Sequence, residues 1–217
     1  MPARTAALAI LLTIGLILVL ILSTFVKAWR ATDTRFQAAI SSARMSIDAK
    51  NLPRDKLDIL LSVEDPKFFE HHGVDLATPG AGLTTITQAL SKELYFDDFR
   101  PGIAKIKQTI CALALDRRID KWRQLDLFLN NAYMGTVDGR DIVGFASAAQ
   151  VYFDKAFDEL NREEFISMVA VLPAPNALNP VMHPDENARR VRKIERMLAG
   201  DCQPDGLRDV FLKNCGD

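Results

Sequence analysis

The sequence predicts a mainly α-helical protein with one N-terminal transmembrane helix. An apolar run without any charged residue covers Thr5–Val26, which is 22 residues. Apolar side chains then recur every three or four residues over Ile103–Ile119, the spacing of one face of a helix. No long stretch alternates apolar and polar residues as a half-buried strand does. These three observations favour helices throughout and a membrane anchor at the start.

The apolar run is long enough to cross a bilayer. A helix of this length extends about 33 Å, against about 30 Å for the hydrocarbon core. A cleaved signal peptide has a shorter apolar region followed by a small-residue cleavage site, which is not found after this run. We therefore expect an uncleaved anchor over residues 1–27, with Trp29 at the membrane interface. Charge leaves its orientation open, because Arg4 precedes the run and Lys27 and Arg30 follow it.

The rest of the chain divides into three parts. Residues 28–56 form a membrane-proximal linker with a helix near Thr34–Ala49, residues 57–199 form a compact domain, and residues 200–217 form a polar tail. Within the domain, helical patterns cover Ile103–Ile119, the segment around Trp122–Leu129, Ile142–Phe153, a segment from Asn161 to the residue before Pro173, and Glu186–Leu198. Asn161 and Glu164 have the spacing of an N-cap and its capping-box partner.

Composition limits the class of protein. Hydrophobic residues make up 48% and charged residues 25% of the chain, an ordinary globular mixture. With 27 Lys and Arg against 28 Asp and Glu, the chain lacks the basic excess of a nucleic-acid-binding protein. Cys111 lies on an apolar helical face and is expected in the core, whereas Cys202 and Cys215 would close a short loop if oxidised. The sequence leaves open whether that pair forms.

Two segments carry residues suited to chemistry. Leu61–Gly73 places Glu64 beside Asp65, with Phe68 and His71 shortly after. An acidic pair among aromatic side chains suits general acid–base work, since apolar neighbours tune a carboxylate. The competing interpretation is a helix end with solvated acidic residues.

The second segment, Gly80–Lys92, joins a glycine-bearing loop to Thr84, Thr85, Gln88 and Lys92. Backbone amides, hydroxyls and a lysine suit an anionic ligand such as a phosphate. The loop has no G-K-[ST] and is therefore not a Walker A motif. The alternative is a loop that only caps a helix.

Taken in order, these motifs resemble the peptidoglycan glycosyltransferases, which comprise the monofunctional transglycosylases and the transglycosylase domains of class A penicillin-binding proteins. The resemblance covers about Leu60–Leu198. It is carried by Glu64, Asp65, Phe68, His71 and Gly73, then Gly82, Thr84, Thr85, Ile86, Thr87, Gln88 and Lys92, then Leu129, Asn130, Tyr133 and Gly135. It implies a lysozyme-like, two-lobed domain behind an N-terminal anchor, and the remaining chain is too short for a penicillin-binding domain.

The resemblance also implies site residues. Glu64 matches the general base, and Lys92 and Lys105 match the cations near a pyrophosphate. Asp65, Phe68, His71, Thr84, Thr85, Gln88 and Asn130 are the further substrate-binding candidates. The sequence departs from the family at the second catalytic carboxylate, where Gln108 stands, and at its Arg and second Gln, where Ala104 and Ala89 stand. A neutral amide cannot take a proton or hold a cation by charge, so Gln108 puts full activity in question.

The implied reaction is inverting transfer of a growing glycan from a lipid pyrophosphate to lipid II. The partners are then lipid II, the lipid-linked glycan, the membrane and other cell-wall synthesis proteins, and the domain faces the periplasm from the inner membrane. No cofactor is required by the sequence itself, but the family's second carboxylate implies Mg²⁺ or Mn²⁺ at the pyrophosphate. The alternatives are a silent relative that binds lipid-linked precursors and, more distantly, a lytic enzyme that cleaves glycan.

Overall fold

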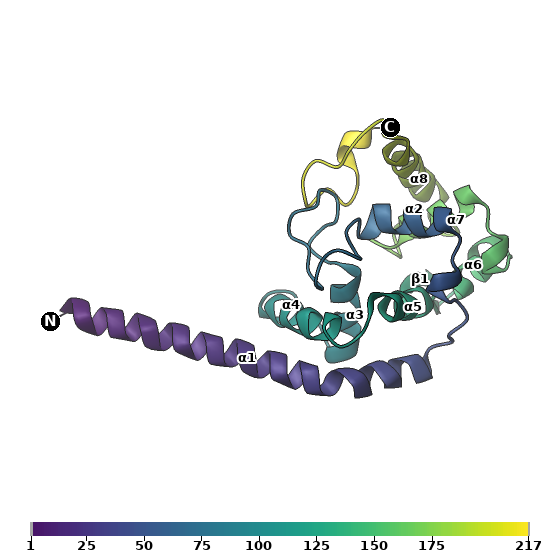
Figure 1. The fold of residues 1–217 in the computed structure, drawn as a ribbon. Helices are drawn as coiled ribbons and strands as arrows, with labels where there is room; N and C mark the ends of the chain where they lie inside the picture. The colour runs from purple at the N-terminus through teal and green to yellow at the C-terminus, as the bar shows by residue number, and fades with distance from the viewer. Residues whose placement is uncertain (1, 217) are drawn as a thin grey trace.

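A computed structural model describes residues 2–216 and is mainly α-helical, as the sequence predicts (Figure 1). The first helix, α1 (Pro2–Ser42), extends far beyond the compact body. Its segment Arg4–Ser42 contains an 18-residue window with a mean hydropathy of 2.9, none of it buried. By length and composition this helix can cross a membrane, and its C-terminal part packs on the domain.

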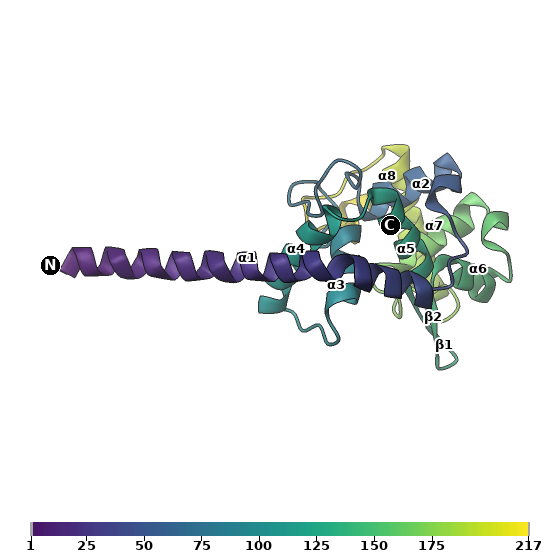
Figure 2. The same cartoon turned by 60° about the horizontal axis from the view of Figure 1, so that its bottom comes forward.

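The domain consists of short helices and one hairpin. In chain order the elements after α1 are η1 (Ala49–Asn51), α2 (Arg54–Glu64), α3 (Ile86–Tyr95), α4 (Ile103–Asp116), α5 (Lys121–Asn131), β1 (Tyr133–Val137), β2 (Arg140–Val143), α6 (Phe145–Phe153), η2 (Phe157–Glu159), α7 (Arg162–Val171), α8 (Pro184–Ala199) and η3 (Lys213–Cys215). The antiparallel β1–β2 hairpin projects from the body in Figure 2.

The helices gather into two groups. Helix α4 packs against α3 and against α1, whereas α7 packs against α8 and α2. Helix α5 contacts both α3 and α6 and so joins the two groups. Buried apolar side chains such as Leu60, Leu125 and Phe165 form one continuous core beneath them. This arrangement places the end of α2 beside the start of α3, where the Ile86 amide donates to the Asp65 carboxylate.

Two predicted helices differ from the structure. The helix expected over Ile142–Phe153 begins only at Phe145, because β2 takes up its first residues. Gly144 separates the two elements at a φ of 80°, and a Cβ there would lie 2.6 Å from the Asn130 carbonyl oxygen. The linker helix expected near Thr34–Ala49 is instead the end of α1, which stops at Ser42. The segment before η1 has no helical hydrogen-bond pattern.

Other local predictions are confirmed. Asn161 caps α7 and forms a capping box with Glu164, and α7 ends at Val171, before Pro173. Cys202 and Cys215 form a disulfide, while Cys111 is a free, buried thiol between α1 and α4. The predicted domain boundaries stay predictions, and their outermost residues, Met1 and Asp217, lie outside the described residues.

Candidate active site

One cleft of about 660 Å³ lies between the two helix groups. Its lining combines the end of α2, the glycine-bearing loop, one face of α3, the start of β1, the segment after α7, one residue of α8 and the C-terminal tail. The polar and charged side chains in this lining are Glu64, Thr84, Thr85, Lys92, Glu93, Tyr133, Arg190 and Arg208. Segments far apart in the sequence therefore meet at one concave surface, the usual setting of a binding site.

Glu64 is the last residue of α2 and lines the cleft. Desolvation by the surrounding protein raises its pKa to about 7, an effect that the neighbouring Asp65 increases and the positive charge of Arg190 partly offsets. A carboxyl with this pKa exchanges a proton near neutral pH, which is what a general acid or base requires. The predicted base therefore lies in the cleft with a suitable proton affinity.

Arg190, on α8, is the positively charged residue that lowers the pKa of Glu64. Arg190 is only 5% exposed, yet its Nε and Nη1 have no hydrogen-bond partner among the described residues. Burying donors without a partner is costly, and Arg190 also lines the cleft, so a ligand oxygen that reached these N–H groups would offset that cost. Arg190 also interacts with Asp209 and lies over the Phe211 ring, both in the tail.

Two lysines carry positive charge close to this cleft: Lys92 on α3 is part of its lining, whereas Lys105 on α4 is not. The Nζ of Lys105 donates to the Thr84 hydroxyl at 2.7 Å. Burial lowers the pKa of Lys105, and the charge of Lys92 lowers it further. Two like charges that repel each other are both stabilised by an anion between them. The pair and the Thr84 hydroxyl therefore suit a phosphate or pyrophosphate.

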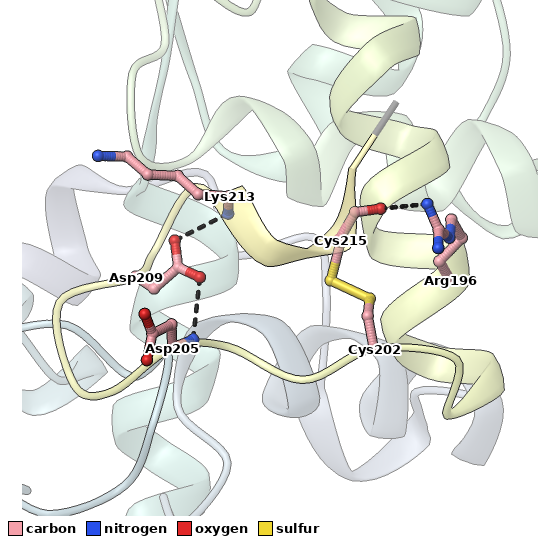
Figure 3. Close-up of a disulfide and its surroundings, with 6 residues drawn as sticks. All are labelled: Arg196, Cys202, Asp205, Asp209, Lys213 and Cys215. Atoms are coloured by element: carbon pink, nitrogen blue, oxygen red, sulfur yellow. Dashed lines mark hydrogen bonds between the residues drawn. A yellow bond between two sulfur atoms is a disulfide. The ribbon is translucent and has the colours of Figure 1, made fainter.

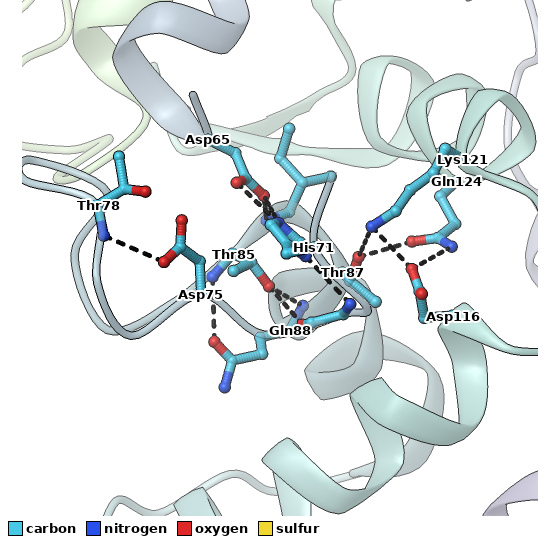
Figure 4. Close-up of polar contacts among 12 residues, drawn as sticks. Asp65, His71, Asp75, Thr78, Thr85, Thr87, Gln88, Asp116, Lys121 and Gln124 are labelled. Atoms are coloured by element: carbon cyan, nitrogen blue, oxygen red, sulfur yellow. Dashed lines mark hydrogen bonds and ion pairs between the residues drawn. The ribbon is translucent and has the colours of Figure 1, made fainter. Parts of the chain in front are cut away.

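Asp65 and His71 point toward each other (Figure 4) and do not line the cleft. The Nε2 of His71 contacts Asp65 Oδ1 at 2.9 Å, and its Nδ1 accepts from the Gly73 amide at 3.0 Å. This pattern assigns the proton to Nε2. Asp65 Oδ2 also accepts from the Ile86 amide at 3.0 Å, at the first turn of α3. The network therefore fixes Glu64, the residue before Asp65, relative to α3.

Thr85 and Gln88 form the capping box that starts α3. The Thr85 hydroxyl accepts from the Gln88 amide, and Gln88 Oε1 accepts from the Thr85 amide, each at 3.1 Å. The Thr85 hydroxyl donates to the Gly73 carbonyl at 2.8 Å. The conformation at Gly73 is required, because its φ is 89° and a Cβ would lie 2.7 Å from the Ala112 carbonyl oxygen. These contacts orient α3 and with it Lys92.

The remaining predicted site residues do not line the cleft. Phe68 is fully buried, with the Nζ of Lys121 4.5 Å from its ring centroid. Asn130 is buried and binds the backbone of Ser46 and Ile47. Gln108 is 1% exposed, and its Nε2 donates to the Gln88 carbonyl at 2.7 Å. Like Asp65, His71 and Gln88, these residues lie outside the cleft lining. The assignment of Gln108 to catalysis and of the others to substrate binding stays a prediction.

Three cleft residues were missed by the sequence analysis. Arg190 lies in a helix that was predicted without any functional residue, and Arg208 lies in the tail, beyond every motif. Glu93 was not among the candidate residues. It lines the cleft and accepts from Asn131 Nδ2 at 2.9 Å, and burial raises its pKa. Glu93 is thus a second carboxyl group in the cleft besides Glu64.

The surroundings of Gln108 do not fit the divalent cation that the family resemblance implies. Hard cations such as Mg²⁺ prefer carboxylate and other oxygen ligands, and Gln108 presents one amide oxygen, buried and without a partner. Across residues 2–216, no group of three His, Cys, Asp or Glu side chains is placed to hold a metal.

Comparison with known proteins agrees with this geometry. The family model described as Transglycosylase matches residues 33–198. The chain is 29% identical over 168 residues to penicillin-binding protein 1F of Bacillus subtilis (strain 168), with 71% of this chain and 23% of the relative covered. It is 31% identical over 168 residues to penicillin-binding protein 1B of Haemophilus influenzae, with 71% and 22% covered.

Penicillin-binding protein 1A of Escherichia coli (strain K12) is 30% identical over 169 residues, with 71% of this chain and 19% of the relative covered. The chain thus spans only about a fifth of the length of these curated relatives. The match ends at residue 198, so the tail that contributes Arg208 and Val210 to the cleft lies outside it.

Proposed function

The chain belongs to the transglycosylase family, and from this premise we propose that it is a membrane-anchored peptidoglycan glycosyltransferase. Its substrates are lipid II and a growing glycan carried on a lipid pyrophosphate. One observation carries the proposal: a carboxyl group with a pKa of about 7, Glu64, lines the same cleft as Lys92 and Arg190. A base for the acceptor and cations for an anionic leaving group are both present.

The proposed reaction begins with the acceptor. Deprotonated Glu64 takes the proton from the 4-hydroxyl of the acceptor sugar, and the oxygen attacks the anomeric carbon of the donor. The bond between that carbon and the pyrophosphate oxygen breaks, and the electron pair leaves with the pyrophosphate. Attack opposite the leaving group inverts the anomeric centre. Lys92 and Lys105 stabilise the negative charge that builds on the pyrophosphate.

Glu93 takes a part in this proposal because the family's second carboxylate is replaced by Gln108. A carboxyl whose pKa is raised by burial holds a proton to higher pH and can give it to a departing phosphate oxygen. Glu93→Gln should then lower turnover while binding of lipid II is kept. Glu70→Gln, an exposed change outside the cleft, is the matched control. Equal turnover in both variants would remove Glu93 from the mechanism.

We place the domain on the outer face of the inner membrane. The disulfide of Cys202 and Cys215 supports this orientation, since disulfides persist in oxidising compartments such as the periplasm. The anchor α1 then holds the cleft near lipid-linked substrates. Other cell-wall synthesis proteins are expected partners on the same side.

The deciding experiment is polymerisation of labelled lipid II by the purified full-length protein. A ladder of glycan products that disappears in Glu64→Gln supports the proposal. Binding of lipid II without any product would instead favour the second candidate, a silent precursor-binding relative. Gln108 is the observation that favours that candidate, because it removes a carboxyl group that the family motif contains.

A further inference from the structure

The C-terminal tail, residues 200–216, is folded against the cleft rather than free. The disulfide joins Cys202 to Cys215 across 13 positions (Figure 3). Asp209 fixes the loop between them, because its carboxylate accepts from the Asp205 amide at 3.0 Å and the Lys213 amide at 2.9 Å. Arg196 of α8 donates to the Cys215 carbonyl. The tail is therefore closed on itself and attached to α8.

This closed tail holds the glycine-bearing loop that forms part of the cleft lining. The Gly80 amide donates to the Gly206 carbonyl at 3.0 Å, and the Gly82 amide donates to the Leu207 carbonyl at 2.7 Å. A Cβ on Gly80 would lie 2.5 Å from Pro204, and one on Gly82 would lie 2.7 Å from Val210. Both glycines thus permit the close approach of the tail.

The tail also contributes directly to the cleft. Arg208 and Val210 line it together with Glu64 and Lys92. Arg208 is exposed where it lines the cleft, and it forms no hydrogen bond or ion pair with the other described residues. Arg190 lines the same cleft, and its charge interacts with both Glu64 and the tail's Asp209. The tail therefore supplies Arg208 to the cleft, and its Phe211 ring packs against Arg190.

We propose that the disulfide-closed tail is a working part of the active cleft, in which Arg208 binds the phosphate groups of the lipid-linked substrate and the disulfide keeps the Gly80–Gly82 loop in place. Guanidinium groups suit phosphate because they donate two parallel hydrogen bonds. The substrate part of this proposal rests on the proposed function. The mechanical part, in which the tail holds the loop, does not.

The mechanical part is tested by hydrogen exchange in the full-length protein in detergent. Cys111→Ala is used as the background, so that no other thiol can exchange with the tail cysteines. Reduction, or the double change Cys202→Ser and Cys215→Ser, should speed exchange of the Gly80 and Gly82 amides at least about tenfold, because their acceptors lie in the released tail. Unchanged exchange at both amides would overturn this part.

The substrate part is tested by the affinity for farnesyl pyrophosphate, which needs no turnover. Arg208→Ala should weaken binding about tenfold, the loss expected for one charge-assisted contact, and Arg208→Lys should restore part of it. Arg192→Ala, an exposed arginine of α8 outside the cleft, is the matched control. Equal affinities of Arg208→Ala and Arg192→Ala would overturn Arg208 as a ligand. An inactive wild type that binds the probe through Arg208 would refute only the proposed polymerase function.

Discussion

Replacing Glu64 by glutamine should abolish turnover and stabilise the fold at the same time. The side chain keeps its size and loses its ability to take a proton, so general base catalysis worth about 10²–10⁴-fold is removed. The protein also holds this carboxyl group in a site that disfavours its charge. Removing the charge therefore relieves a cost that the active site imposes on folding.

The size of that cost follows from the pKa. Glu64 has a pKa of about 7 in the fold, against an ordinary value of 4.5. Each pKa unit corresponds to about 1.4 kcal/mol, so the folded state loses up to about 3 kcal/mol of stability when the group ionises. Because the folded pKa is raised, the loss starts as the pH rises past 4.5 and is complete above about 7.

Thermal unfolding of full-length Glu64→Gln and wild type, in one detergent at pH 5 and pH 8, measures this effect. At pH 8 the variant should melt about 6–12 °C higher, using about 2–4 °C per kcal/mol for a chain of this size. At pH 5 the difference should fall below about a third of that value, since most of the linkage lies at higher pH. Glu70→Gln, an exposed glutamate in the same segment, should show no such pH-dependent difference.

The reasoning is refuted if Glu64→Gln melts at or below the wild-type temperature at pH 8. The same conclusion follows if the gain is equal at both pH values, because a charge-independent packing effect would then explain it. A variant that is more stable but keeps more than about a tenth of wild-type turnover would retain the pKa argument and remove Glu64 as the base.

Three further predictions concern the charges of the site and the orientation of the chain. Arg190→Met should move the rising limb of the pH–rate profile to higher pH, because the arginine lowers the pKa of Glu64; an unmoved limb would show that this pair is not coupled. Gln108→Glu alone should lower the melting temperature, because it sets a carboxylate against the Gln88 carbonyl of α3. Adding Ala104→Arg, one helical turn earlier, should recover stability and raise turnover, because the two charges can pair. A reporter that is active only in the periplasm, fused after Asp217, should give signal; activity of a cytoplasmic reporter there would reverse the proposed orientation.

Local patterns in the sequence were sufficient for much of the fold. The capping box of Asn161 and the breaker at Pro173 set the ends of α7, because caps and prolines act within a few residues. The same is true of the apolar N-terminal run, whose length alone indicates a membrane span. The prediction failed at Ile142–Phe153, where an apolar segment satisfied the helical pattern but its first residues pair with β1 instead.

The candidate site was predicted in part. Glu64, Thr84, Thr85 and Lys92 were named from motifs and do line one cleft. Gln108 was named from the same kind of motif, yet its side chain is turned to the Gln88 carbonyl and is buried. A motif records which residue types occur at which spacing, but burial and direction depend on how the helices pack.

The sequence by itself determined the apolar N-terminal helix, most of the other helices and the family, because these follow from local periodicity and from residue types in a fixed order. Only the tertiary structure decided that Arg190 faces Glu64, that Glu93 lines the cleft and that the tail carries Arg208 into it. Each of these contacts joins segments distant in the chain, or depends on which face of a helix is left uncovered. The pKa of Glu64 has the same origin, since desolvation by neighbouring segments is its main cause.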